Sequence, residues 1–248
     1  MDDKGPHARL VAIDVADDPE AWASAGFTVA EDRVTLGDTT VHLTGRRDGV
    51  KGITGWHLAG VPVQGADLDG LPTFAVDRPT DHPADTDAAA AHPNGVIGLD
   101  HVVVLTPDLD RTIAALEAVG LRLRRIRDTN SYGAPMRQAF FRLGGTVLEV
   151  VGGEDGSGRP AADDPARWFG LAVDVDDLDA TGALLGAGLG HVKTAVQEGR
   201  RIATLRHKDL GMSVAIAAMD HHGGRPATGP ADATADPSAS DSTDAPHH

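Results

Sequence analysis

Cysteine is absent from the 248 residues, which excludes disulfides, thiolate metal ligands and a cysteine nucleophile. Aromatic residues make up only 4% of the chain, so an apolar core has to consist mainly of Val, Leu, Ile and Ala. Cations are also scarce, because 22 Lys and Arg face 37 Asp and Glu, which gives a formal net charge of −15. Phosphate binding needs clustered Lys and Arg, so we expect no nucleic-acid partner.

Long hydrophobic runs are missing as well. No stretch of about 18 apolar residues occurs, and such a stretch is what a membrane-spanning helix requires. Residues 1–7 lack the apolar segment of a signal peptide. We therefore expect a cytoplasmic protein without a membrane partner, whose 41% of hydrophobic residues suffices for a proper core.

One apolar stretch, residues 97–106, predicts a strand that carries His101. Pro107 and Asp108 predict a helix start directly after it, and strands are expected at 122–127, 137–143 and 146–151. Residues two apart in a strand point to the same face, and adjacent residues point to opposite faces. Glu149 and His101 therefore point away from the face that their adjacent apolar residues share. If the helix covers the apolar face, His101 and Glu149 remain together on the open face as a candidate site.

The same order of elements recurs later in the chain. A strand at 168–175, a helix at 177–189 and strands at 191–196, 201–205 and 213–218 repeat it at an offset of 178 − 109 = 69 residues. Residues 9–61 show a weaker version, with strands at 9–15, 28–30, 33–36, 39–43 and 52–61. We predict a reduced N-terminal unit at 1–75, a linker at 76–96, a paired-unit domain at 97–219 and a disordered tail at 220–248.

This repeated unit resembles the vicinal oxygen chelate superfamily, which includes glyoxalases, bleomycin-resistance proteins and extradiol dioxygenases. The residues that carry the resemblance are Leu99-Asp100-His101-Val102 with Pro107-Asp108-Leu109-Asp110, and Val147-Leu148-Glu149-Val150. It implies an α+β fold in which βαβββ units form curved mixed sheets around a cavity. It also implies a divalent metal, held by the histidine and glutamate positions of both units, that chelates oxygens of a small-molecule substrate.

His101 and Glu149 match the ligand positions of the first unit, and the resemblance gives Glu149 a further role in moving a proton. The second unit departs from the pattern, because alignment places Gly170 opposite His101 and Ala215 opposite Glu149. In the N-terminal unit His42 matches Glu149, and His57 opens a strand-like run that can be matched to Gly170. We therefore name His57 as a candidate third ligand, with a homodimer partner or the substrate as other sources.

Substrate-binding candidates are cations and one aromatic residue near the later strands. Arg137 and Arg201 could hold an anionic group through paired hydrogen bonds, as could Arg142 and Arg200. Tyr132, the only tyrosine, lies in a polar loop that could close over the site. The alternative for these arginines is ordinary surface charge at a sheet edge.

Two functions from different classes follow. The first is a metal-dependent enzyme, a glyoxalase-like lyase or isomerase or a dioxygenase, that acts on a small oxygenated substrate. Imidazole and carboxylate ligands suit Fe, Mn, Ni, Co or Zn, so the ligand types do not select the metal. The second is a metal-free small-molecule binding or sequestering protein of the bleomycin-resistance type. Gly170 and Ala215 favour the second, and the pairing of His101 with Glu149 favours the first.

Overall fold

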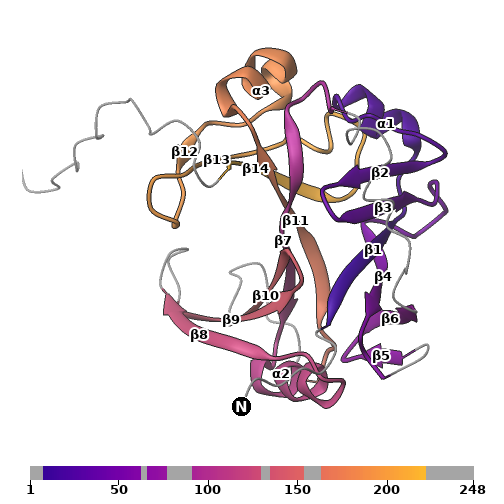
Figure 1. Cartoon of the computed structure of the whole chain (residues 1–248), viewed down its shortest axis with the longest axis vertical. Coiled ribbons are helices and arrows are strands. Elements are labelled where there is room, and N and C mark those ends of the chain that lie inside the picture. Colours follow the sequence, from indigo (N-terminus) through magenta and orange to yellow (C-terminus); the bar gives the residue numbers. More distant parts are fainter. Residues whose placement is uncertain (1–7, 63–65, 77–90, 130–134, 154–162, 222–248) are drawn as a thin grey trace, which may run out of the picture.

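The computed structural model describes residues 8–62, 66–76, 91–129, 135–153 and 163–221, which form two mixed β-sheets around one apolar core. Figure 1 shows the N-terminal sheet, in indigo and purple at the right, beside the central strands of a larger curved sheet. Repeated units in curved mixed sheets are the fold that the sequence predicts, and this prediction is confirmed. Within the described ranges, no helix is both long and apolar enough to cross a membrane.

The N-terminal sheet has six strands in the order β2-β3-β1-β4-β6-β5. Its elements are β1 (Arg9–Val15), α1 (Pro19–Ser24), β2 (Arg33–Leu36), β3 (Thr39–Leu43), β4 (Ile53–Ala59), β5 (Ala66–Leu68) and β6 (Leu71–Val76). The antiparallel pair β1–β4 joins two reduced units, one from β1 to β3 and one from β4 to β6. Sequence patterning fades after residue 61, so β5 and β6 were not predicted, and the strand expected at 28–30 is only an isolated bridge at Ala30.

The C-terminal sheet has eight strands in the order β12-β13-β14-β11-β7-β10-β9-β8. Its first unit contains β7 (Val96–Thr106), α2 (Leu109–Ala118), β8 (Leu123–Thr129), β9 (Met136–Leu143) and β10 (Thr146–Gly153). Its second contains β11 (Arg167–Val175), α3 (Leu178–Leu185), the 3₁₀ turn η1 (Gly186–Gly188), β12 (Lys193–Thr194), β13 (Arg201–Thr204) and β14 (Ala215–Asp220). The antiparallel pair β7–β11 joins the two units.

The repeated acidic motif starts the two helices of this sheet. The Asp108 carboxylate accepts a hydrogen bond from the backbone N–H of Arg111, and the Asp177 carboxylate accepts from the N–H groups of Asp179 and Ala180. A side-chain oxygen at this position satisfies amide donors that have no partner inside the helix. The sequence repeat is therefore a repeated helix cap, which explains why it marks the same point in both units.

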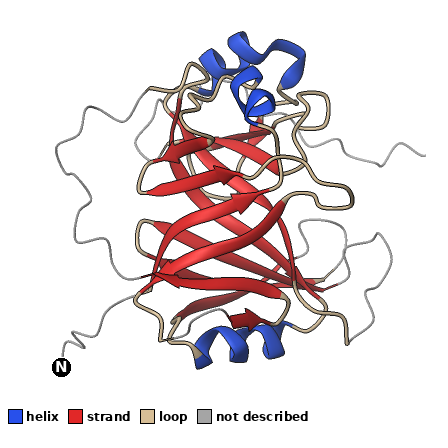
Figure 2. Ribbon diagram, turned by 90° about the vertical axis from the view of Figure 1, so that its right-hand side faces the viewer, coloured by secondary structure: helices blue, strands red, loops and turns tan. Residues whose placement is uncertain are grey.

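The two sheets pack back to back. Trp56 of β4 is fully buried and meets Trp168 of β11 edge to face, with ring centroids 5.1 Å apart. Val102 and Leu148, on the same face of the larger sheet, are also fully buried. Figure 2 shows the helices gathered at the two ends of the molecule, so they leave the outer sheet faces uncovered. Each sheet consequently keeps one open face, and the two open faces point in opposite directions.

Replacing Trp56 tests whether the sheets share one core. We expect Trp56→Ala to lower the free energy of unfolding by about 3–5 kcal/mol, because it removes a large side chain from a packed layer. Ile97→Ala, at a side chain 45% exposed, should change it by no more than about 0.5 kcal/mol. Urea unfolding followed by fluorescence and circular dichroism measures both variants. Two separate transitions in the wild type would contradict a shared core.

Candidate functional site

His101 and Glu149 lie together on the open face of the eight-stranded sheet. The parallel pair β7–β10 sets His101 beside Val147 and Val103 beside Glu149. This register brings the Nε2 atom of His101 to 3.6 Å from an Oε atom of Glu149. Their side chains are each 15% exposed, so they are largely buried but reachable from solvent.

A β-bulge adds Asp100 to this face. In the pair β7–β11, Leu99 is opposite Val173 and His101 is opposite Ala172, which leaves Asp100 as the extra residue. Simple strand alternation would place Asp100 on the far side from His101, and this is why sequence reasoning missed it. Instead an Asp100 Oδ atom lies 2.6 Å from His101 Nδ1, which leaves Nε2 of the ring facing Glu149.

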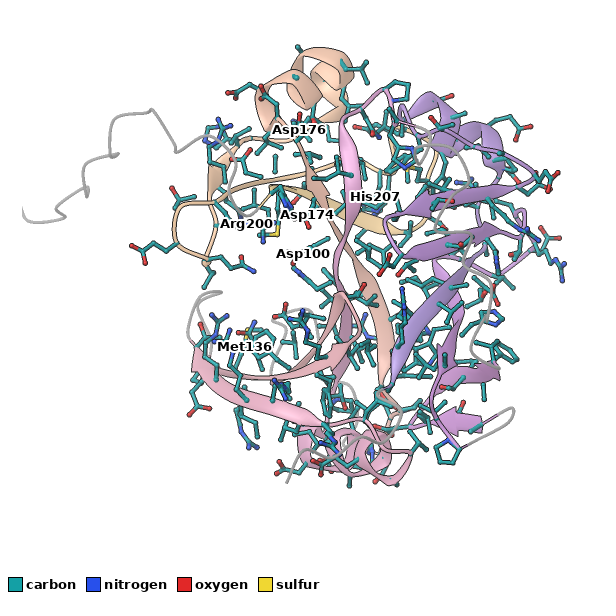
Figure 3. All side chains as sticks on the ribbon, in the orientation of Figure 1. Asp100, Met136, Asp174, Asp176, Arg200 and His207 are labelled. Atoms are coloured by element: carbon teal, nitrogen blue, oxygen red, sulfur yellow. The ribbon has the colours of Figure 1, made fainter. Side chains whose placement is uncertain are left out.

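Arg200 anchors Asp100 from the second unit. Its guanidinium donates to the other Asp100 oxygen at 2.8 Å and also binds Asp174, while its side chain is only 3% exposed. Figure 3 shows Asp100, Asp174 and Arg200 grouped on the open side of the sheet. Burial alone would raise the pKa of Asp100, but hydrogen bonds from His101 and Arg200 outweigh it and hold that pKa at about 2. Asp100 is therefore a fixed anion that orients His101.

At Glu149, in contrast to Asp100, burial has a larger effect on the pKa than the neighbouring charges. Burial raises the pKa of its carboxyl group above 4.5, and the positive charges of His101 and Arg127 only partly oppose this. The Gln138 amide donates to Glu149 at 2.6 Å and accepts from Arg127 Nε at 2.9 Å. Glu149 is thus a partly buried carboxyl group that holds its proton more tightly than an ordinary glutamate.

Two cations stand over an aromatic ring beside Glu149. The guanidinium carbons of Arg125 and Arg127 lie 4.7 and 5.6 Å from the Phe140 ring centroid, and Phe140 is opposite Glu149 in the β9–β10 register. Stacked guanidinium groups are well suited to bind a planar anionic group. Sequence reasoning missed both arginines, although their alternation along residues 123–129 could have marked the face they share.

His57 does not join His101. It lies on β4 of the other sheet, where its Nε2 atom is 3.0 Å from Asp14, and the back-to-back packing separates the two open faces. The structure therefore does not bring His57 to His101 and Glu149, the two residues with which the sequence groups it. With Asp14 and His42 it forms a different group that could hold a metal ion.

The predicted substrate-binding arginines lie on the covered side of the larger sheet. Arg137 pairs with Asp110 of α2, and Arg201 pairs with Asp220 and with Asp179 of α3. Tyr132 falls outside the described residues. The structure therefore brings neither arginine to Glu149, because alternation along β9 and β13 turns them toward the helices.

Arg137 instead borders a hollow of about 490 Å³ at the start of α2. Three carboxylate residues, Asp108, Asp110 and Asp128, share its lining. Neither His101 nor Glu149 reaches it. We place the candidate site at His101 because titratable groups converge there, whereas the hollow's acidic side chains already serve a helix cap and the Arg137 ion pair.

In the described part of the second unit, the positions that match His101 and Glu149 carry no metal ligand, and at the first of them the backbone leaves no room for one. Gly170 pairs with Ala215, as His101 pairs with Val147, so the register makes Ala217 rather than Ala215 the counterpart of Glu149. A Cβ atom on Gly170 would lie 2.4 Å from the Ala215 carbonyl oxygen. A histidine therefore cannot take the position that matches His101 unless β11 and β14 move apart.

The donor set does not complete a metal site. His101 Nε2 and Glu149 are spaced closely enough to share an ion, but Asp100 has both oxygens engaged, one by His101 and one by Arg200. The Gln138 amide also occupies one Glu149 oxygen. Asp174 also lies on this side but binds Arg200. Among the described residues, His101 and Glu149 form no group of three possible ligands, whereas catalytic sites of this kind use three protein ligands.

The family model of the Glyoxalase/Bleomycin resistance protein/Dioxygenase superfamily matches residues 100–204. This range runs from within β7 to the end of β13, so it holds the candidate site and most of both units but not β14. The match spans less than half of the chain and makes residues 100–204 similar to this superfamily. Among curated proteins, none matches this sequence.

Solved structures of the vicinal oxygen chelate type share the architecture of both sheets. A mutant of 4-hydroxymandelate synthase from Streptomyces coelicolor matches with a TM-score of 0.61 and 18% identity, over 89% of this chain and 94% of that one. A fusion protein of a xylose isomerase-like TIM barrel and a 4-hydroxyphenylpyruvate dioxygenase matches with a TM-score of 0.59 and 13% identity, over 91% of this chain and 51% of that one. At such identities the likeness shows the fold alone.

The raised pKa of Glu149 predicts a pH-dependent cost to stability. At pH 7 an ionised Glu149 is disfavoured by burial, so the uncharged and isosteric Glu149→Gln should raise the free energy of unfolding. Below the folded-state pKa the wild type regains its proton before the unfolded chain does. The difference between the two proteins should therefore shrink as the pH falls toward 4.5.

Urea unfolding at a series of pH values measures this difference. Asp110→Asn, at a side chain 76% exposed, is the matched control and should change the free energy of unfolding by no more than about 0.5 kcal/mol. A Glu149→Gln effect that stays constant with pH would mean that the carboxyl group is not shifted.

Proposed function

We propose that this vicinal oxygen chelate protein is an acid–base enzyme of the lyase or isomerase type. Its open face would bind a small oxyanionic substrate and transfer a proton at a carbon next to a carbonyl group. The observation that carries the proposal is the buried Glu149 carboxyl with its raised pKa, 3.6 Å from an imidazole that Asp100 orients. General acid–base catalysis requires a carboxyl group whose pKa has moved toward the working pH.

Each group has a role that follows from its contacts. Glu149 takes the proton from the carbon, and the electron pair of the broken C–H bond moves onto the carbonyl oxygen. His101 presents Nε2 to the same space and can donate to that oxygen, because Asp100 binds the other ring nitrogen. Return of the proton to a different carbon, or to the other side of the same carbon, completes an isomerisation.

Arg125 and Arg127 would hold the anionic group of the substrate. Both lie on β8 and stand over Phe140, which is opposite Glu149 in the neighbouring pair β9–β10. They form a cationic pair in a protein whose net charge is −15. Arg200 does not contribute a free charge, since Asp100 and Asp174 neutralise it. Anion binding here therefore depends on the β8 arginines.

No step of this proposal passes through a metal ion, because His101 and Glu149 alone are two donors. A metal-dependent dioxygenase would need further metal ligands at the positions that match His101 and Glu149. Gly170 and Ala217 occupy those positions and have no side-chain donor. A metal-free binding protein is the second candidate, and the closed ligand position at Gly170 favours it. Both candidates use the same face, but only the enzyme breaks a C–H bond.

Hydrogen–deuterium exchange at carbon separates the two candidates. The protein is incubated in D₂O with a panel of small carboxylates that carry a ketone or thioester beside a C–H bond, and proton NMR follows loss of the C–H signal. We expect exchange for at least one compound, lowered by at least about 100-fold in Glu149→Gln. Arg125→Gln should raise KM about tenfold with a smaller effect on kcat, because it removes substrate contacts made before the proton moves.

Arg33→Gln is the control, because Arg33 lies at the edge of the other sheet and is exposed. It should leave exchange unchanged. Compounds that bind, as judged by calorimetry, but never exchange would contradict the enzyme and support the binding protein. Exchange that survives Glu149→Gln would contradict the role given to Glu149.

A further inference from the structure

Three adjacent strands of the N-terminal sheet bring Asp14, His42 and His57 together on its open face. The strands are adjacent in the order β3-β1-β4. Asp14 of the central strand pairs with His42 of β3 on one side and with Gly55 of β4 on the other. His57 lies two residues after Gly55 on β4. The sequence neighbours of Asp14, His42 and His57 point the other way, into the core between the sheets. Residues from three separate segments, up to 43 positions apart, thus meet at one point.

The distances among these side chains suit a single ion. Asp14 Oδ1 lies 2.9 Å from His42 Nδ1, Asp14 Oδ2 lies 3.0 Å from His57 Nε2, and all the ligand atoms lie within 4.8 Å of one another. Ligand atoms around a tetrahedral ion with bonds of about 2.0–2.1 Å are roughly 3.3 Å apart. Small side-chain rotations would therefore bring all three atoms onto one ion.

Ring contacts limit how the two histidines can turn. The His57 ring stacks on Phe74 at 5.0 Å with an interplanar angle of 27°. The His42 ring meets it edge on, at 5.5 Å and 71°. The side chains of Asp14, His42 and His57 are 21%, 33% and 22% exposed, so an ion could enter from solvent and keep a position for water.

We propose that Asp14, His42 and His57 bind one divalent transition-metal ion on the outer face of the N-terminal sheet. Two imidazole nitrogens and one carboxylate form a donor set for zinc, cobalt or nickel rather than for magnesium or calcium, which take oxygen ligands. Three protein ligands with an open fourth position is a common coordination for such ions. The site has one donor more than His101 and Glu149 offer, and it is independent of the proton transfer proposed for the other sheet.

Titration with zinc and cobalt tests the proposal on the untagged full-length chain. Three C-terminal histidines, His222, His247 and His248, are first replaced by alanine so that they cannot bind metal. We expect one equivalent of zinc by calorimetry, visible cobalt absorption bands and a higher melting temperature with zinc, because an ion that binds only the folded state stabilises it.

Glutamine variants separate metal binding from hydrogen bonding. His42→Gln and His57→Gln keep an N–H donor for Asp14 but remove a good metal ligand, so both variants should fold. Their affinity for zinc should fall at least about 100-fold, and zinc should no longer raise their melting temperature. Asp14→Asn should act in the same way. His207→Gln, which lies outside the group, should bind zinc like the background protein.

Three results would overturn the proposal. Absence of a zinc equivalent in the folded protein, or binding that is unchanged in His42→Gln and His57→Gln, would leave the three side chains as a hydrogen-bonded triad only. If the double variant His101→Gln and Glu149→Gln no longer binds one equivalent of zinc while His57→Gln still does, the metal lies on the other sheet. That result would also contradict the proposal.

Discussion

Trp56 and Trp168 meet in the apolar layer between the two sheets, and this packing decides which faces remain available for chemistry. Val102 and Leu148 of the larger sheet are buried in the same core cluster as Trp56. With one face of each sheet buried, the polar side chains of alternate positions are left on the outer faces. The His101 group and the Asp14 group are therefore two sites on opposite sides of one core rather than halves of one site.

On the larger sheet, a single extra residue reshapes the site. The bulge at Asp100 turns a carboxylate toward the same face as His101, where Arg200 from the second unit neutralises it. The two units are thus coupled through the ion pair between Asp100 and Arg200. The second unit supplies a buried cation and a closed glycine position, while the first unit supplies the groups that can move a proton.

The close backbone contact at Gly170 also limits which residues this position can accept. Restoring a histidine there would require β11 and β14 to separate, because the Ala215 carbonyl occupies the space that a Cβ atom needs. Backbone packing at that point is rigid, since the strands pair in parallel over six residues. On the N-terminal sheet, Asp14, His42 and His57 bring three possible metal ligands together on the open face.

Three features could be predicted from the residues alone: the repeated units, the helix starts at Asp108 and Asp177, and the pairing of His101 with Glu149. The helix starts follow from capping chemistry between neighbouring residues, and the His101–Glu149 pairing follows from strand alternation together with the family resemblance. The sequence also identified His57 as a histidine of interest. Three other features could not be predicted without the folded chain: His57 faces away from His101, Asp100 joins the site, and Arg137 and Arg201 do not. Those outcomes depend on how two sheets stack, where a strand bulges and which register two strands adopt, and contacts between residues far apart in the chain set all three.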